Sequence, residues 1–80
     1  MNIQIINIIE VINGIVQVPE SFVIYEEHLS FGVVEKAEKL FTELALENGI
    51  EKSYIDECLD NRSFDDNNGY EVIINWSNVN

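Results

Sequence analysis

The chain has 80 residues, of which 46% are hydrophobic, and its fifteen Asp and Glu residues against four Lys and Arg residues give a formal net charge of −11. This length suits one domain, so residues 1–80 are expected to form a single compact unit. The abundance of isoleucine and aromatic residues argues against disorder, because disordered chains lack the apolar surface that offsets chain entropy. The negative charge argues against direct binding to nucleic acid or to an anionic membrane, since both repel it.

Cys58 is the only cysteine, so no internal disulfide can form and a reducing compartment is favoured. The first residues lack the basic stretch and the cleavage site of a signal peptide, and polar residues interrupt their apolar run. No stretch reaches the roughly 20 apolar residues of a membrane-spanning helix. A cytoplasmic location is therefore expected.

The first predicted element is a β-hairpin around Asn13-Gly14, because both residues tolerate the positive φ of a type I′ turn. Residues 5–12 also fit a helical stripe, but their β-branched side chains and the Asn-Gly pair favour strands. A two-residue loop sets the register, and Glu10 and Gln17 mark one face as polar. The opposite face is expected to meet the core and carries Ile9, Val11, Val16 and Val18. The face with Glu10 also bears apolar residues that something must cover, namely Ile6, Ile8, Ile12 and Ile15.

Pro19 has no backbone N–H to donate to a neighbouring strand, so a break or bulge in the sheet is predicted at this point. A third strand is predicted over residues 22–25, with Phe22 and Ile24 on one face. A loop then opens at residues 26–28.

From Ser30 to Asn48 the apolar residues recur about every 3.6 positions, which predicts the longest helix of the chain. Ser30 can cap its start, and Gly49 with Ile50 fits a Schellman stop at its end. The stripe that should face the core comprises Val33, Val34, Ala37, Leu40, Phe41, Leu44 and Ala45.

Leu46 projects into the polar arc of this helix and is the one candidate apolar contact outside the core. Two interpretations stay open. The side chain packs under the segment that follows the helix, or it contacts a partner.

Ser53 and Asp56 resemble a capping box, which predicts a second helix of two or three turns ending near Asn61. Its short apolar stripe comprises Ile55, Cys58 and Leu59. Residues 65–69 have the composition of a turn, and the alternation from Tyr70 to Trp76 predicts a final strand, paired with a short one at Ser63-Phe64. Residues 77–80 are expected to fray.

Together these elements predict an α+β fold. A small antiparallel sheet, made of the N-terminal hairpin, the third strand and the C-terminal strand, packs against one long and one short helix in the order β-β-β-α-α-β.

A calcium loop of the EF-hand type is not supported. Placing Gly69 at its glycine position puts Phe64 and Asn75 where carboxylate ligands are required. A solvated hairpin turn therefore explains Asp65 and Asp66 better.

The sequence also gives little support for catalysis. His28 is the only histidine, and Cys58 lies on an apolar stripe, where cysteine usually serves as a small hydrophobic residue. We therefore expect no catalytic residue, no metal site, no cofactor and no enzymatic activity.

The acidic surface is what the sequence offers as a binding site. We expect a non-enzymatic acidic interaction module, for instance an inhibitor or nucleic-acid mimic of phage or mobile-element type, that engages a basic surface of a partner protein. The alternative is a small structural protein that self-associates, for instance as a homodimer, through its isoleucine-rich sheet without a dedicated acidic face. The candidate acidic residues are Glu35, Glu38, Glu43, Glu47, Glu51, Asp56, Glu57, Asp60, Asp65 and Asp66.

Overall fold

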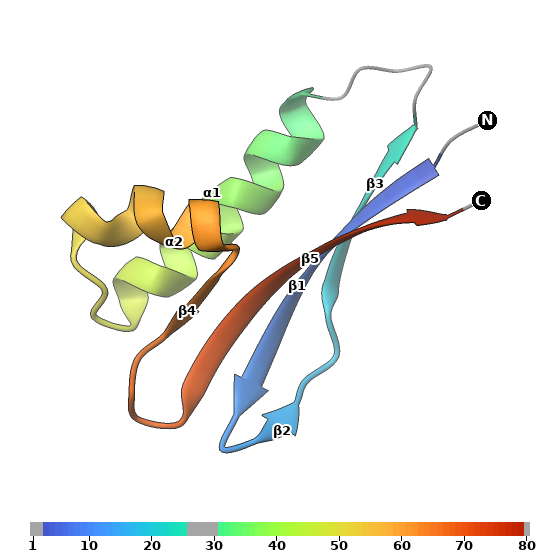
Figure 1. The fold of residues 1–80 in the computed structure, drawn as a ribbon. Helices are drawn as coiled ribbons and strands as arrows, with labels where there is room; N and C mark the ends of the chain where they lie inside the picture. The colour runs from blue at the N-terminus through green and yellow to red at the C-terminus, as the bar shows by residue number, and fades with distance from the viewer. Residues whose placement is uncertain (1–2, 26–30, 80) are drawn as a thin grey trace.

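The computed structural model describes residues 3–25 and 31–79, which form an antiparallel sheet and two α-helices (Figure 1). The strands are β1 (Ile3–Ile12), β2 (Ile15–Val16), β3 (Glu20–Tyr25), β4 (Ser63–Asp65) and β5 (Tyr70–Val79). The helices are α1 (Phe31–Glu47) and α2 (Ile55–Asn61), and a 3-10 turn, η1 (Lys52–Tyr54), leads into α2. The predicted α+β class and the order β-β-β-α-α-β are confirmed, with β4 as the short strand before the last one.

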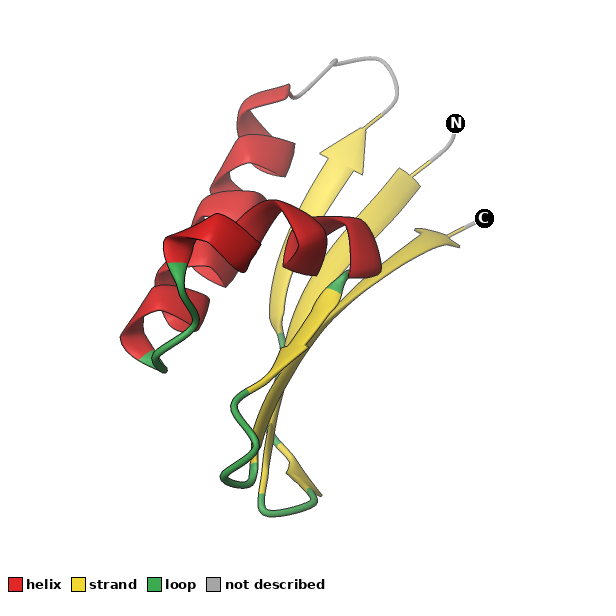
Figure 2. Cartoon of the chain, turned by 60° about the vertical axis from the view of Figure 1, so that its left-hand side comes forward, coloured by secondary structure: helices red, strands yellow, loops and turns green. Residues whose placement is uncertain are grey.

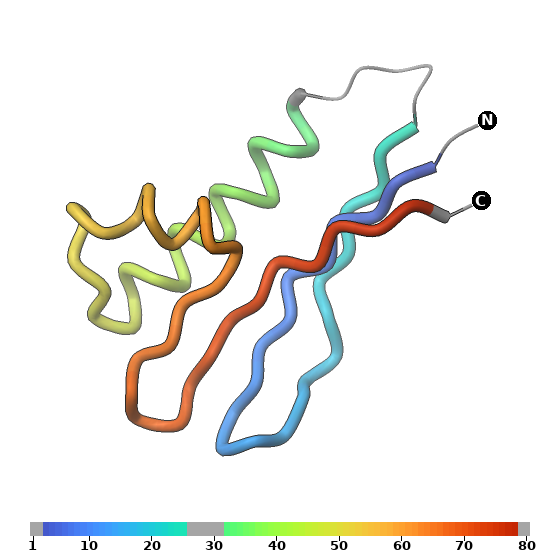
Figure 3. The backbone as a smooth tube through the Cα atoms, in the orientation of Figure 1, coloured from blue at the N-terminus to red at the C-terminus, as the bar shows by residue number. Residues whose placement is uncertain are grey.

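β1 is the central strand of the sheet. β5 runs antiparallel to it along its whole length, from Ile3 opposite Val79 to Ile12 opposite Tyr70. On its other side β1 pairs with β3 and then with β2, while β4 pairs with β5 near the turn that joins them. The first and last strands of the chain therefore lie side by side, as the tube in Figure 3 shows.

The predicted break near Pro19 is confirmed. Val11 pairs with Val16 as the hairpin register predicts, whereas the partner of Ile8 is Glu20. β1 thus advances three residues while its partner advances four, so one extra residue is accommodated around the proline.

The face of β1 that meets the core is not the predicted one. Ile6 and Ile8 are each 2% exposed, whereas Ile9 on the other face is only half-buried. Glu10 does not lie on the solvent side as predicted. It lies on the core side, where its carboxylate accepts a hydrogen bond from the Tyr70 hydroxyl at 2.7 Å. The face wrongly expected in the core is the one with Ile9, Val11 and Val16, and Val18 lies in the break, 93% exposed.

The predicted C-terminal stop of α1 is confirmed. Gly49 has a φ of 85°, its N–H donates to the carbonyl of Leu46, and the N–H of Ile50 donates to the carbonyl of Ala45. This pair of hydrogen bonds is the Schellman motif. The predicted cap at Ser30 and the loop at residues 26–28 lie outside the described residues.

The predicted capping box of the second helix is wrong. Ser53 lies inside η1, and neither η1 nor α2 has a side-chain hydrogen bond at its N-terminal cap. The 3-10 turn already gives Ser53 a helical backbone, so it cannot take the extended conformation of a capping residue. α2 does end at Asn61, where Arg62 adopts a φ of 57°.

The prediction that residues 77–80 fray is wrong for the three that are described. β5 continues to Val79, because Ser77 and its neighbours pair with the first residues of β1. The alternation predicted for this strand is confirmed, since Val72 is fully buried and Ile74 packs against the core. The turn between β1 and β2 contacts the turn between β4 and β5, since the N–H of Asn13 donates a hydrogen bond to the carbonyl of Gly69.

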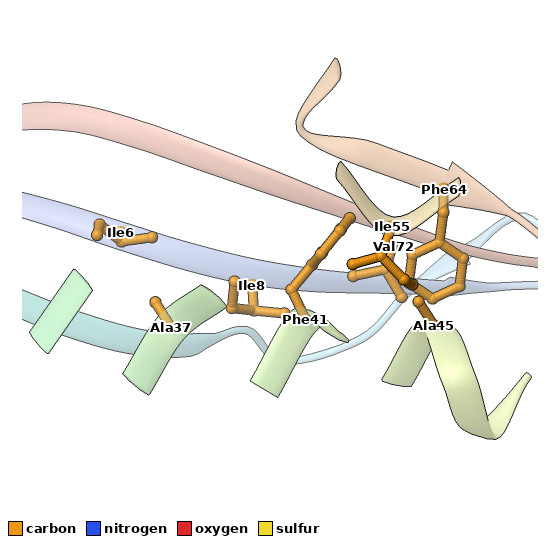
Figure 4. Close-up of a cluster of buried hydrophobic side chains, with 8 residues drawn as sticks. All are labelled: Ile6, Ile8, Ala37, Phe41, Ala45, Ile55, Phe64 and Val72. Carbon is orange, nitrogen blue, oxygen red and sulfur yellow. The ribbon is translucent and has the colours of Figure 1, made fainter. Parts of the chain in front are cut away.

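The core lies between one face of the sheet and the two helices (Figure 4). α1 contributes side chains spaced by four residues, which places them along one side of the helix. The ring of Phe41 meets that of Phe64 edge-on, with centroids 5.3 Å apart. The buried side chains are Ile6, Ile8, Ala37, Phe41, Ala45, Ile55, Phe64 and Val72.

Candidate interaction surfaces

α1 carries four of the predicted acidic residues on its solvent side. They are exposed because the stripe centred on Phe41 turns the other side of the helix towards the sheet. Both helices lie over the same face of the sheet (Figure 2), so the solvent side of α1 points away from it. The four residues are Glu35, Glu38, Glu43 and Glu47.

One of these carboxylates, that of Glu47, stands where it opposes helix stability. Glu43 and Glu47 are four residues apart, and like charges at this spacing cost about 0.2 to 0.5 kcal/mol. Glu47 is also the last residue of α1, at the negative end of the helix dipole, in a turn that holds no basic residue. Glu35, by contrast, precedes Lys39 by four residues, which is the favourable order for an ion pair. Lys39 in turn precedes Glu43 by four residues and offsets its repulsion by Glu47, so helix stability leaves only Glu47 without an explanation.

Leu46 lies between these two carboxylates in sequence and on the exposed side of α1. It is 46% exposed, so the segment that follows the helix does not bury it. Leu46 therefore offers apolar surface beside the two carboxylates. We call Glu43, Leu46 and Glu47 the α1 acidic patch.

A second group of predicted acidic residues follows α1. Asp56 and Glu57 occupy the first turn of α2, where carboxylates interact favourably with the helix dipole. Asp60 lies near the other end of α2, and Glu51 precedes η1 without making a capping hydrogen bond. All four side chains are exposed.

Asp65 and Asp66 hold the turn between β4 and β5. Asp65 accepts a hydrogen bond from the backbone N–H of Asn67 at 2.7 Å. Asp66 accepts two, from the N–H of Asn68 at 2.7 Å and from that of Tyr70 at 3.1 Å. The hairpin-turn interpretation is confirmed, and these carboxylates already have a structural role.

The environment of Cys58 does not activate its thiol. Partial burial and the neighbouring Glu57 carboxylate raise its pKa, so the nucleophilic thiolate is disfavoured. It lies in a shallow depression of about 420 Å³, beside Ile50 and Phe64. His28, the only histidine, lies outside the described residues, so the structure does not place it relative to Cys58.

A smaller cavity of about 70 Å³ lies between α1, α2 and the sheet. Its lining is mostly apolar, with Glu38, Arg62 and Trp76 as the polar and aromatic members. The Arg62 guanidinium lies 5.7 Å from the centre of the Trp76 ring. Ligand pockets usually measure about 300 to 1,000 Å³, so this space suits one or two water molecules rather than a substrate.

The described residues hold neither a metal-binding cluster nor a membrane-spanning helix. No three His, Cys, Asp or Glu side chains among them gather closely enough to hold a metal ion. Within the same ranges no helix is both long and apolar enough to cross a membrane.

The sheet has a second face that neither helix covers, and we call it the open sheet face (Figure 2). Ile5 on this face is half-buried, whereas its neighbour Ile6 on the core face is 2% exposed. Towards the edge of the sheet Tyr25 is 47% exposed, and Val16 is 66% exposed. The strand registers place these apolar side chains on the open sheet face: Ile3, Ile5, Ile9, Val11, Val16, Val23, Tyr25 and Ile73.

A polar row crosses the middle of the open sheet face. Asn7 lies between Ser21 of β3 and Asn75 of β5, and the Ser21 hydroxyl donates to the Asn7 side-chain oxygen at 2.6 Å. Asp65 and Glu71 are paired at the hairpin end of the same face. Apolar residues of β1 flank the polar row symmetrically, with Ile3 and Ile5 on one side and Ile9 and Val11 on the other.

The sequence identified the acidic residues, but it did not separate those with a structural role from those without one. It also missed the polar row. Asn7, Ser21 and Asn75 are far apart in sequence, and nothing links them before the pairing of β1 with β3 and β5 is known.

Comparison of this chain with protein-family models, with curated proteins and with solved structures finds no match. Functional inference therefore depends on the surfaces themselves.

Proposed function

We propose that this protein is a non-enzymatic interaction module that engages a basic surface of a partner protein. The binding surface is the α1 acidic patch together with the exposed carboxylates around it. The observation that carries the proposal is the placement of Glu47 where it opposes the stability of its helix. A charge that destabilises its own helix is best explained by a role outside folding.

The overall charge distribution supports the same proposal. Residues 35–66 hold ten acidic and four basic side chains, and every one of these acidic side chains except Asp66 is exposed. Such a surface accelerates encounter with a basic partner and disfavours acidic ones. Leu46 would then supply an apolar contact within this surface.

The spacing of the carboxylates favours a partner that normally binds nucleic acid. Residues four apart on a helix are separated by about 6 Å along its axis, close to twice the roughly 3.4 Å phosphate repeat of one DNA strand. Glu43 with Glu47 and Asp56 with Asp60 have this spacing. An inhibitor that mimics nucleic acid, as found in phages and mobile elements, is the specific form of the proposal, and it would act in the cytoplasm.

The proposal includes no catalytic step, no cofactor and no direct contact with nucleic acid or membrane. The protonated state favoured at the Cys58 thiol supports a binding role rather than nucleophilic catalysis. The charge of −11 repels phosphate groups and anionic lipids alike.

The test is capture of basic nucleic-acid-binding proteins by immobilised chain at low and high salt, with duplex DNA as competitor. We expect capture that weakens with salt, because exposed charges are screened over about 10 Å at 0.1 M ionic strength. Duplex DNA should compete. Capture that is unchanged between low and high salt would contradict the proposal.

A matched pair of double variants locates the surface. Glu43→Gln with Glu47→Gln removes two charges from the α1 acidic patch and should reduce capture at least about tenfold. Glu20→Gln with Glu71→Gln removes two charges from the sheet and should leave capture nearly unchanged. The first variant also relieves unfavourable helix electrostatics, so its loss of binding cannot be attributed to unfolding. Equal effects of the two variants would remove the α1 acidic patch from the proposal.

A further inference from the structure

We propose that the open sheet face binds a second copy of this chain, forming a two-fold symmetric dimer of face-to-face sheets. This surface is separate from the α1 acidic patch, and the inference does not depend on the partner proposed above. In such a dimer both helical layers point outwards, so the α1 acidic patch of each copy stays accessible (Figure 2).

Charge is the first argument for a second copy. A chain with a net charge of −11 repels its own copy wherever carboxylates meet. On the open sheet face the described carboxylates are Asp65 and Glu71, and both lie at the hairpin end. The rest of that face is apolar or neutral, so two anionic chains can approach there with the least repulsion.

The pattern of side chains on β1 is the second argument. A two-fold interface brings a surface against itself, so the surface must be self-complementary. Asn7 is the centre of a pattern in which apolar residues recur two and four positions away on each side. If the two β1 strands cross antiparallel over Asn7, the apolar residues of one β1 meet those of the other and the two polar rows face each other. The facing pairs are then Ile5 with Ile9 and Ile3 with Val11, each from opposite copies.

The antiparallel arrangement is also the one that separates the carboxylates. In a parallel arrangement the hairpin ends of the two copies, with Asp65 and Glu71, would lie at the same end of the interface. Antiparallel crossing instead places the two hairpin ends at opposite ends of the interface. The distance between them is then about 25 Å, at roughly 3.3 Å per residue along the strands.

The size of the face is sufficient for a specific dimer. β1 has ten residues, and three strand positions lie side by side across most of the face. At roughly 3.3 Å per residue and 4.8 Å between strands the footprint is about 450 Å², and side-chain relief raises the accessible area to about 600 Å² per copy. The total of about 1,200 Å² is at the lower end of the range for specific interfaces and above most crystal contacts. A reversible dimer with micromolar affinity is expected.

The test is sedimentation velocity over a concentration series at about 0.15 M salt, where charges beyond roughly 8 Å are screened. Wild-type protein should show a reversible monomer–dimer equilibrium. The test variant is Asn7→Asp, which has the same shape and can still accept the hydrogen bond from Ser21. It brings two carboxylates together at the symmetry axis and should raise the dissociation constant at least about tenfold.

Asn78→Asp is the matched control, because it adds the same charge to the same sheet at an exposed position on the face with the helices. Its dissociation constant should stay within about twofold of wild type, and far-ultraviolet circular dichroism should show that all three proteins are folded. Wild-type chain that stays monomeric at millimolar concentration overturns the proposal and leaves the open sheet face to a different protein. Equal weakening by Asn7→Asp and Asn78→Asp also overturns it, because the dimer would then form elsewhere.

Discussion

Alanine substitutions at Ile8 and Ile9 test which face of β1 meets the core. The two isoleucines are neighbours in one strand, so the loss of β propensity is similar for both. Ile8 is 2% exposed and belongs to the core, whereas Ile9 is half-buried on the open sheet face. Their difference in stability therefore reports the difference in packing.

The expected magnitudes follow from burial. Ile8→Ala removes three buried carbon atoms and leaves a cavity, which should lower the free energy of unfolding by about 3 to 4 kcal/mol. Ile9→Ala leaves no enclosed cavity, and a loss of about 1 kcal/mol is expected. Domains of this length have a total stability of about 4 to 12 kcal/mol, so the Ile8 variant should be close to unfolding or markedly weakened.

The measurement is equilibrium unfolding in urea, followed by the fluorescence of Trp76, the only tryptophan. The protein is kept dilute, at concentrations where the midpoint does not change with concentration, so that self-association does not contribute. With a urea dependence of about 1 to 1.5 kcal/mol per molar, the two midpoints should differ by about 1.5 to 3 M. Equal midpoints, or a larger loss for Ile9→Ala, would refute the assignment of the core face.

Three further predictions concern local structure. Gly49→Ala should lower the free energy of unfolding by about 1 kcal/mol, since the φ of 85° at this position disfavours a side chain. Gly32→Ala should stabilise the protein slightly, because Gly32 lies in α1 and an added Cβ would meet open space. Urea midpoints measure both effects. Burial and the hydrogen bond to the Glu10 carboxylate raise the pKa of Tyr70, so its contribution to stability is present below the unfolded pKa of about 10 and is lost as pH rises further. Unfolding curves against pH should show this loss for wild type, and a Tyr70→Phe variant with the same loss would contradict it. Asp66→Ala should lower the free energy of unfolding by about 1 to 2 kcal/mol, measured by thermal unfolding, because two backbone N–H groups lose their acceptor. Asp66→Asn keeps an acceptor oxygen and should recover most of this loss. Equal losses in the two variants would show that the acceptor oxygen is not what stabilises the turn.

The acidic surface could be predicted in part from the sequence. The periodicity of residues 30–48 places Glu43, Leu46 and Glu47 on the solvent side of a helix without any tertiary information. Which acidic residues also have a structural role, and whether Leu46 is covered, could be learned only from the structure. It shows that Asp66 is used by a turn and that Leu46 stays exposed after the chain leaves the helix.

Local chemistry determined the turns and the helix end. Asn13 and Gly14 adopt φ values of 51° and 81°, and Gly49 one of 85°, as a hairpin turn and a Schellman stop require. These features depend on residues within a few positions of one another, so the sequence alone suffices to predict them. Pro19 likewise identifies the break between β2 and β3, because a missing N–H is a property of the residue itself.

Only the tertiary structure decided which face of β1 is inside. Isoleucine lies on both faces, so alternation alone cannot orient the strand, and the polar marker Glu10 is satisfied on the core side by the distant Tyr70. The pairing of β1 with β5 joins the two ends of the sequence and has no local signal. Burial of one face therefore depends on where α1 packs, and the same choice leaves the open sheet face to solvent or to a second copy.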